Sequence, residues 1–182
     1  MLFNLFGKKD DGAESHVFID RAYVSTAAKM KACAELAKNE PKHVFICWFA
    51  DTATQFKAFF REQGLDESQV VETHHLHASK LLNKTPVFVE HYPLHSKEIE
   101  LIKNWDAINI VVYSALDEPL FKHFGSDKII PLMKMLGMKE EEVIEHDMVS
   151  KSIIKGQEKI ARQVTLEQSA ASQEEWMRKN IK

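Results

Sequence analysis

The sequence predicts an α/β fold, a parallel β-sheet flanked by helices, and three observations carry that prediction. The segment HVFICWF, residues 43–49, is a continuous apolar run of strand length, as expected for a strand covered on both faces. Similar runs alternate along the chain with stretches of helical pattern, which is typical of crossover units joining parallel strands. The 182 residues, 45% of them hydrophobic, are enough to bury one substantial core.

The first predicted unit is a strand followed by a helix. Residues 17–23 have the pattern of a short strand, and Ser25 or Thr26 is placed to cap a helix that runs to about Asn39. Pro41 closes this helix, because proline cannot continue the backbone hydrogen-bond ladder. The apolar strand comes directly after it.

A helix is predicted after the apolar strand. Thr52 and Gln55 have the spacing of a capping box, and Gly64 lies where a helix would stop. Between them, apolar side chains recur at helical spacing, which indicates one buried face. These side chains are Ala53, Phe56, Phe59 and Phe60.

Three further strands are predicted, each followed by residues of helical pattern. They cover residues 69–72, 86–90 and 108–115. Right-handed connections between such units produce a parallel sheet.

Residues 124–153, FGSDKIIPLMKMLGMKEEEVIEHDMVSKSI, are predicted to be a connector of short, sharply terminated helices. Ser126 is placed to cap one of these helices. Pro131 indicates that the helix starts late, near Ile130, since proline is tolerated only in a first turn.

Two features of this connector are predicted to serve the structure. Gly137 is expected to end its helix in the left-handed conformation and to set Met138 back against Met133. Glu145 with His146 has the residue types of a general acid-base pair, but we expect a structural role, such as His146 hydrogen-bonding a helix end.

The chain becomes polar from Met148 onward, without any strand signal, and this pattern predicts one or two helices that leave the globular body. The predicted organisation is therefore an N-terminal peptide and linker (1–15), an α/β domain (16–147) and a C-terminal helical extension (148–182).

The composition excludes several classes of protein. A formal net charge of −3 offers no field that attracts nucleic acid, so no nucleic-acid partner is expected. Cys33 and Cys47 stand in apolar contexts and are expected to be buried, reduced thiols. No apolar run approaches the roughly 20 residues that span a bilayer, and the N-terminus lacks the charge order of a secretory signal, so we expect a cytoplasmic protein.

Polar side chains follow the predicted strands, where open parallel sheets bind their ligands. The residues of this candidate ligand crevice are Trp48, Asp51, Glu72, Glu90, Ser114 and Asp117. No cofactor is predicted. One alternative is a nucleotide that is bound without hydrolysis, through Trp48 or the turn from Ser114 to Asp117.

Histidines follow two of these strands, in the segments HHLH and EHYPLH. Two strand ends that are neighbours would place four of them around one zinc ion, with Glu72 or Glu90 in support. These candidate ligands are His74, His77, His91 and His95. A catalytic zinc needs three ligands and an open position, but this spacing matches no established signature, and solvated or capping histidines are the favoured interpretation.

The segments FGSDKI, LGM and IEHDMVSKSI, with Gln157 and Lys159 behind them, closely resemble a region of the SecA preprotein translocase family. In that family the second nucleotide-binding domain passes there into the long helix of the helical scaffold. The resemblance extends upstream through VYSALDEPLFKHFG and through HVFICWFADTATQF, which is similar to the strand and helix of helicase motif IV. It implies a RecA-like, helicase C-terminal-like domain of the P-loop NTPase fold.

The residues that such motors use on ATP are missing from this sequence. A phosphate loop requires G-x-x-x-x-G-K-[ST], and Gly7 and Gly12 have its spacing but are followed by Ala13 and Glu14. The family's arginine-rich motif VI would fall near residues 96–109, which contain no arginine to clamp a phosphate. We therefore expect a stand-alone, non-catalytic relative and no enzyme activity.

The resemblance implies a protein-interaction or regulatory module linked to protein translocation, with the secretion motor or a second copy as its partner. An apolar stripe on the tail needs cover from the body, a second copy or another protein. The candidate interaction residues are Met135, Met138, Ile160, Val164 and Trp176. The peptide MLFNLF is similar to the family's lipid-contacting N-terminus, which implies a weak peripheral contact with the inner membrane through residues 1–9.

Overall fold

The fold is described from a computed structural model, which defines residues 17–105 and 109–181. The predicted N-terminal peptide and its membrane contact lie outside the described residues. Five strands form one sheet, all parallel, in the order β1-β5-β4-β2-β3, so the predicted α/β architecture of RecA-like type is confirmed. The strands are β1 (Val17–Tyr23), β2 (His43–Cys47), β3 (Val70–Glu72), β4 (Thr85–Phe88) and β5 (Asn109–Ala115).

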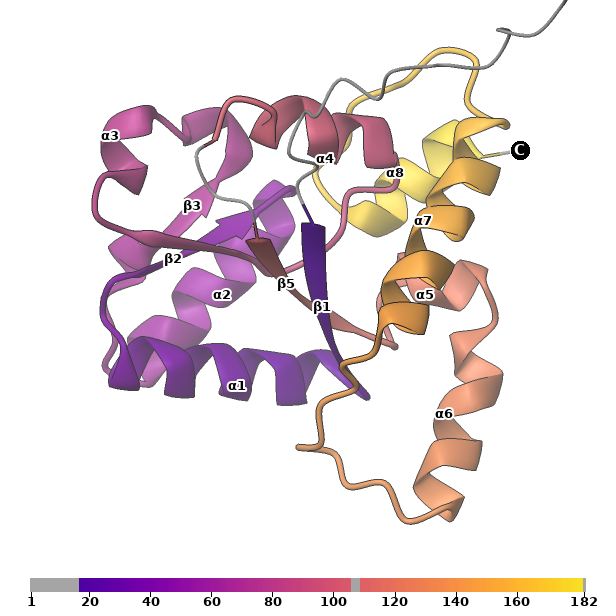
Figure 1. The fold of residues 1–182 in the computed structure, drawn as a ribbon, viewed down its shortest axis with the longest axis horizontal. Coiled ribbons are helices and arrows are strands. Elements are labelled where there is room, and N and C mark those ends of the chain that lie inside the picture. The colour runs from indigo at the N-terminus through magenta and orange to yellow at the C-terminus, as the bar shows by residue number, and fades with distance from the viewer. Residues whose placement is uncertain (1–16, 106–108, 182) are drawn as a thin grey trace, which may run out of the picture.

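Helices cover both faces of the sheet (Figure 1). The chain moves one way along the sheet from β1 to β3 and returns through β4 to β5, so right-handed crossovers place α1 and α2 on one face and α3 and α4 on the other. Two short 3₁₀ helices flank β3. The bounds are α1 (Thr26–Asn39), α2 (Ala50–Glu62), η1 (Glu67–Gln69), η2 (Thr73–His75), α3 (Ala78–Leu81) and α4 (His95–Ile102).

The core forms two layers, one on each side of the sheet. Phe45 of β2 packs with Phe60 on the side of α1 and α2, and the next residue, Ile46, packs with Ile102 of α4 on the other side. Every residue of β2 is buried, which explains why this strand is a continuous apolar run rather than an alternating one. Cys33 and Cys47 are buried free thiols, as predicted.

Four helices gather beyond the carboxyl ends of β1 and β5 (Figure 1): α5 (Pro119–His123), α6 (Ser126–Met135), α7 (Asp147–Ala161) and α8 (Gln173–Asn180). The expectation that the C-terminal part leaves the globular body is wrong. Ile160 of α7 and Trp176 of α8 are fully buried against Phe49 and Leu120, in a third apolar cluster. Burial of apolar side chains therefore holds α7 and α8 on the body. Of the three alternatives for covering the apolar stripe, namely the body, a second copy or another protein, the body is the one observed.

The connector between α6 and α7 ends α6 as predicted. Gly137 has a φ of +88°, in the left-handed region that glycine adopts without a steric penalty. The N–H of Gly137 donates to the carbonyl of Lys134, and the N–H of Met138 donates to the carbonyl of Met133, both at 3.1 Å. This pair of bonds is the Schellman motif, which satisfies carbonyls that the helix end leaves without partners.

The pair Glu145 and His146 also serves the structure. The Nδ1 atom of His146 accepts the N–H of Met148 at 3.1 Å and so caps the start of α7. The carboxylate of Glu145 binds Nε of Arg21 in β1 at 2.8 Å. Both residues therefore position α7 against the sheet, and the predicted helix-end role of His146 is confirmed.

Two predicted helix starts are wrong. α2 begins at Ala50, two residues before the predicted cap Thr52, whose hydroxyl donates to the distant Glu90 instead. α6 begins at Ser126 and keeps Pro131 in its interior, rather than starting late. In the first case a tertiary carboxylate replaces the local cap, and in the second the helix tolerates the lost proline N–H bond.

Among the helices in the described part of the chain, none combines the length and the apolar character needed to cross a membrane.

Candidate functional site

The strand ends open onto a cavity of about 260 Å³ between α1, α2, α5 and α8. This is the position predicted for a ligand, and we call it the strand-end crevice. Its polar lining comes from five separate segments of the chain. The polar lining residues include Thr26, Lys29, Asp51, Thr52, Glu90, Asp117, Glu118, Ser172, Gln173 and Glu174.

Glu90 holds the start of α2 from inside this crevice. Its Oε1 accepts the N–H groups of Trp48 at 2.9 Å and Phe49 at 3.1 Å, and its Oε2 accepts the hydroxyl of Thr52 at 2.7 Å. Burial raises the pKa of Glu90 to about 7, and the neighbouring Lys29 offsets this only in part. The adjacent strands β2 and β4 continue into helices on opposite faces, so Glu90 occupies the switch point where such sheets bind anions.

Side-chain oxygens also accept the backbone N–H groups at the starts of α1 and α5. Asp117 Oδ1 accepts both the N–H and the hydroxyl of Thr26 at the start of α1, at 2.8 and 2.7 Å. Gln173 Oε1 accepts the N–H of Leu120 at the start of α5, at 2.8 Å. Helix N-terminal N–H groups that could hold an anion therefore already have partners within the protein.

The segment leading into α8 forms one wall of the crevice. The carbonyl of Ala171 accepts the N–H of Asp51 at 3.0 Å, and Gln173 Nε2 donates to the carbonyl of His91 at 2.9 Å. These bonds join the C-terminal segment to the start of α2 and to the loop after β4. The C-terminal helices thus complete the crevice instead of extending away from it.

A buried ion pair lies at the base of the crevice. Lys29 Nζ contacts Glu118 Oε1 at 2.5 Å and the carbonyl of Val89 at 2.6 Å, and the Lys29 side chain is only 2% exposed. Burial alone would lower the pKa of Lys29, but the carboxylates of Glu118 and Glu90 outweigh it and raise that pKa, so Lys29 is an ammonium ion. Glu118 Oε2 and Ser114 Oγ are buried and have no hydrogen-bond partner among the described residues.

His91 lies between two carboxylates. Its Nε2 is 2.6 Å from Asp20 Oδ1 and its Nδ1 is 2.9 Å from Glu98 Oε1, and all three side chains are buried. Burial acts to lower the pKa of His91, but Glu98 and Asp20 raise it to about 10, so the ring is an imidazolium that donates through both nitrogens. Gln157 of α7 donates to Glu98 Oε2 at 2.9 Å and ties this group to the C-terminal part.

The free energy of unfolding is expected to fall as the pH rises from about 6.5 to about 10, because of His91. A histidine whose pKa is higher in the folded than in the unfolded chain contributes fully below the unfolded pKa and loses that contribution as the pH passes the folded one. Chemical denaturation of the wild type and of His91→Gln across this range measures the effect.

Glutamine does not titrate, so the decline in His91→Gln should be shallower than in the wild type, by about 1.4 kcal/mol for each unit of lost pKa shift. His123→Gln changes an exposed histidine on α5 and should keep the wild-type slope. Equal slopes in His91→Gln and the wild type would contradict an imidazolium at His91.

The four histidines predicted around one metal are not brought together as a ligand set. Both ring nitrogens of His91 contact carboxylates, and His95 Nδ1 contacts Glu98 Oε2 at 3.2 Å. His74 and His77 are exposed at the far side, around η2. The reason is the sheet order, because β2 separates β3 from β4 and the two strand ends are not adjacent.

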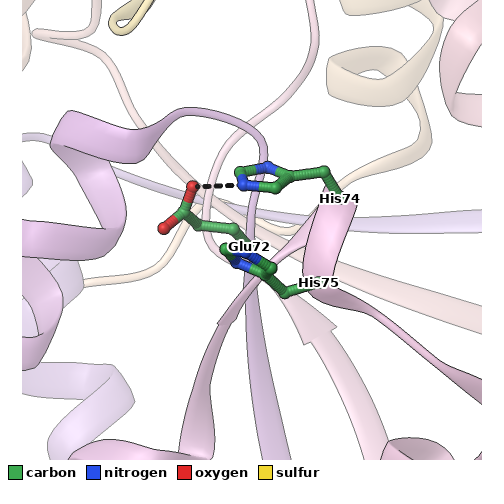
Figure 2. A group of neighbouring side chains, drawn as sticks. All are labelled: Glu72, His74 and His75. Atoms are coloured by element: carbon green, nitrogen blue, oxygen red, sulfur yellow. Dashed lines mark ion pairs between the residues drawn. The ribbon is translucent and has the colours of Figure 1, made fainter.

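A different group gathers at the end of β3. Glu72, His74 and His75 form the one cluster of three such side chains in the described residues whose ligand atoms all lie within 4.8 Å of one another (Figure 2). Two of its members, Glu72 and His74, were predicted as candidates, whereas His75 was not. The signal for His75 was present in the sequence as the adjacent pair of His74 and His75.

The predicted interaction residues separate into two groups. Met135 is 84% exposed at the end of α6, and Met138 after it is half-buried. Val164 is half-buried at the edge of the third apolar cluster, in which Ile160 and Trp176 are fully buried. Among these candidate residues, only Met135 at the end of α6 belongs to an uncovered apolar surface.

That surface extends along α6 from Ile129 to the residue just after the helix end. Its exposed apolar side chains, which we call the α6 surface, are Ile129, Leu132, Met135 and Leu136. Beside it lies a cavity of about 380 Å³, the α6 groove, between α5, α6 and α7. The groove is lined mainly by apolar side chains, including Leu120, Phe121, Phe124, Ile129, Met148 and Ile153.

The remaining crevice candidates have varied surroundings. Trp48 stacks on Phe88 with ring centroids 5.5 Å apart and contacts Tyr92, so its ring serves largely as packing. Asp51 is exposed at the crevice rim. Sequence reasoning missed Lys29, although it lies four residues before Cys33 on the buried face of α1, where a lysine requires a buried partner.

Part of the sequence matches protein translocase subunits. The protein translocase subunit SecA of Acidithiobacillus ferrooxidans is 54% identical over 48 residues, which are 26% of this chain and 5% of that subunit. The protein translocase subunit SecA 1 of Chlorobium chlorochromatii is 45% identical over 53 residues, 29% of this chain and 5% of that subunit. SecA of Chlorobaculum tepidum is 43% identical over 53 residues.

This chain covers only 5% of the length of the curated relatives it matches. No protein-family model matches the sequence. A region amounting to 26–29% of this chain is therefore related in sequence to the protein translocase subunit SecA.

Proposed function

We propose that this chain is a SecA-related protein-interaction module that acts in protein translocation and does not hydrolyse ATP. The observation that carries the proposal is the α6 surface, an exposed apolar face next to an apolar groove. Its partner is the secretion motor, which presents an amphipathic helix to this face.

The α6 surface has the spacing of a helix-binding face. Ile129, Leu132 and Leu136 follow one another at intervals of three and four residues and so share one side of α6. Met135 lies beside Leu136, and both are at least 80% exposed. A contiguous apolar patch of this kind marks an interaction site, and methionine adapts its shape to an incoming helix.

The groove supplies a wall for the same partner. Ile129 belongs both to the α6 surface and to the lining of the groove, so the two are continuous. Met148 of α7, also exposed, lies on the opposite wall. An apolar helix laid along α6 would bury side chains from both walls at once.

Two observations support the absence of ATP hydrolysis. The sequence contains no G-x-x-x-x-G-K-[ST] segment, whose lysine and hydroxyl reach the phosphates and magnesium. At the switch point of the sheet, the N–H groups of Trp48 and Phe49 are taken by the carboxylate of Glu90. A triphosphate there would have to displace the buried Glu90 side chain, which already occupies these N–H groups.

The relation to SecA supports the choice of partner. A segment of this chain is 43–54% identical to SecA, which links the chain to the same protein-translocation system. The motor is therefore the protein best suited to cover the face that α6 leaves open. The same reasoning makes a second copy of this chain the competing occupant.

The double variant Met135→Ser/Leu136→Ser is expected to weaken binding to purified SecA from the same organism by at least about tenfold. Each buried apolar side chain of this size contributes about 1.5–3 kcal/mol, and 1.4 kcal/mol is a factor of ten. Isothermal titration calorimetry measures the change. The thermal midpoint should stay near that of the wild type, because both side chains are largely exposed.

A matched control is Lys134→Ser/Lys139→Ser, which changes two exposed side chains of the same segment without removing apolar area. It should bind like the wild type. A second variant, Gly156→Ala, places a Cβ 2.6 Å from Phe124 Cε2, so the ring at the groove must move while alanine favours the helix. Binding should weaken again without loss of the fold.

Three outcomes would contradict the proposal. Purified SecA that does not bind the wild type would remove the named partner. Self-association that disappears in the double variant, observed by sedimentation, would assign the α6 surface to a second copy. Turnover of ATP-Mg by the purified chain would remove the non-catalytic part.

A further inference from the structure

We propose that Glu72, His74 and His75 form a binding site for a divalent transition metal of the zinc type (Figure 2). This site lies at the free edge of the sheet, after β3, and shares no residue with the α6 surface or its groove. It is therefore independent of the proposed interaction function.

The local backbone brings the three side chains together. Glu72 ends β3 and pairs in register with Cys47 of β2, so the sheet fixes its position. The chain then turns directly into the 3₁₀ helix η2, Thr73–His75. With three residues per turn, a 3₁₀ helix places side chains at i and i+3 above one another, which brings His75 back to Glu72.

The distances fit a tetrahedral ion. His74 Nε2 lies 3.3 Å from Glu72 Oε2. Two ligand atoms that each bind zinc at about 2.0–2.2 Å are about 3.3–3.5 Å apart in a tetrahedron, so this pair already has the required separation. The three ligand atoms lie within 4.8 Å of one another, and the exposed histidine rings can close the remaining gap by side-chain rotation.

The fold holds Glu72 more firmly than it holds the histidines. The Glu72 side chain is 14% exposed and held by its strand, whereas the His74 side chain is 62% exposed. A fixed carboxylate with two adjustable imidazoles allows the site to contract around an ion. Two imidazoles and a carboxylate suit zinc, nickel or copper better than magnesium or calcium, which prefer all-oxygen sites.

Among the described residues, no hydrogen bond within the fold occupies the ring of His74 or His75. His43, His91, His95 and His146 each contact a carbonyl, a carboxylate or a helix N–H within the fold. In the described part of the chain, the ring of His74 meets only the carboxylate of Glu72 at ion-pair distance. The two neighbouring rings also lie close together, with centroids 4.0 Å apart and planes inclined by 47°.

Three protein ligands leave one position of a tetrahedral ion for water or a small anion. His74 also lines an open cavity of about 580 Å³ together with Trp48, Tyr92 and Lys97. A ligand on the fourth position would therefore stand at the rim of this cavity, near a cationic side chain.

The test is titration of Zn²⁺ into the full chain, purified without a histidine tag and stripped with a chelator. One ion per chain is expected by calorimetry. His74→Ala and His75→Ala should each weaken binding at least about a hundredfold, since even indirect partners of a metal site contribute ten- to a hundredfold. Glu72→Gln keeps the shape of the side chain and should also weaken binding, because the neutral amide is a poorer ligand.

His123→Ala removes an exposed histidine on α5 and should leave Zn²⁺ affinity unchanged. Substitution with Co²⁺ gives a second readout, since tetrahedral cobalt absorbs visible light strongly, and this band should disappear in His75→Ala. Zn²⁺ binding that survives the double variant His74→Ala/His75→Ala, or a stoichiometry well below one, would overturn the assignment. Because both rings are exposed, these variants are expected to fold.

Discussion

Replacing Lys29 with methionine is expected to lower the free energy of unfolding by about 3–5 kcal/mol, the cost of leaving a buried charge without its partner. The Lys29 ammonium contacts Glu118 Oε1 at 2.5 Å, and both side chains are buried. Glu90 adds a second buried carboxylate nearby, so the variant would leave two acidic groups with no cation. Urea denaturation at neutral pH measures the loss.

Two variants make this test specific. Lys31→Met changes an exposed lysine on the same helix and should shift stability by less than about 0.5 kcal/mol. The double variant Lys29→Met/Glu118→Gln should be more stable than Lys29→Met alone, because it removes the uncompensated charge. If Lys29→Met lost no more stability than Lys31→Met, the ion pair would not be the anchor that the structure describes.

The second large effect concerns α8. Trp176→Ala is expected to destabilise the protein by about 3–5 kcal/mol, as for other large buried aromatic residues. The ring is fully buried, packs edge-on against Tyr92 with centroids 5.8 Å apart, and donates from Nε1 to Glu167 at 3.0 Å. Thermal and chemical denaturation should show one cooperative transition at a lower midpoint.

Leu166→Ala is the matched control, since Leu166 is 82% exposed in the same C-terminal part. It should change stability by less than about 0.5 kcal/mol. Limited proteolysis adds a local readout, because cleavage within 162–181 should accelerate in Trp176→Ala only. An unchanged midpoint in Trp176→Ala would indicate that α8 is an appendage, as the sequence pattern alone had suggested.

Much of the fold was predictable because its signals are local. The apolar run of β2 and the helical spacing of Phe56 and Phe60 depend on neighbours a few residues away. The left-handed Gly137 depends on backbone sterics alone, so the end of α6 and its two hydrogen bonds followed from the residue type. The resemblance to SecA also came from a continuous stretch of sequence.

The crevice was only partly predictable because its contacts are long-range. The position of Glu90 after a predicted strand made it a candidate. Its hydrogen bond with Thr52, 38 positions away, forms because β2 and β4 are adjacent in the sheet. The grouping of histidines failed for the same reason, since β2 lies between the strands that precede His74 and His91.

The sequence by itself determined most of the elements, the parallel α/β sheet and the absence of a G-x-x-x-x-G-K-[ST] segment from these residues, because these depend on side-chain spacing along the chain. Tertiary structure alone decided that Lys29 and Gln173 fill the crevice, that α8 returns to the body, and that α6 stays uncovered. The physical reason is that burying charges and apolar faces requires partners whose positions are set by strand order, and spacing along the chain does not specify that order.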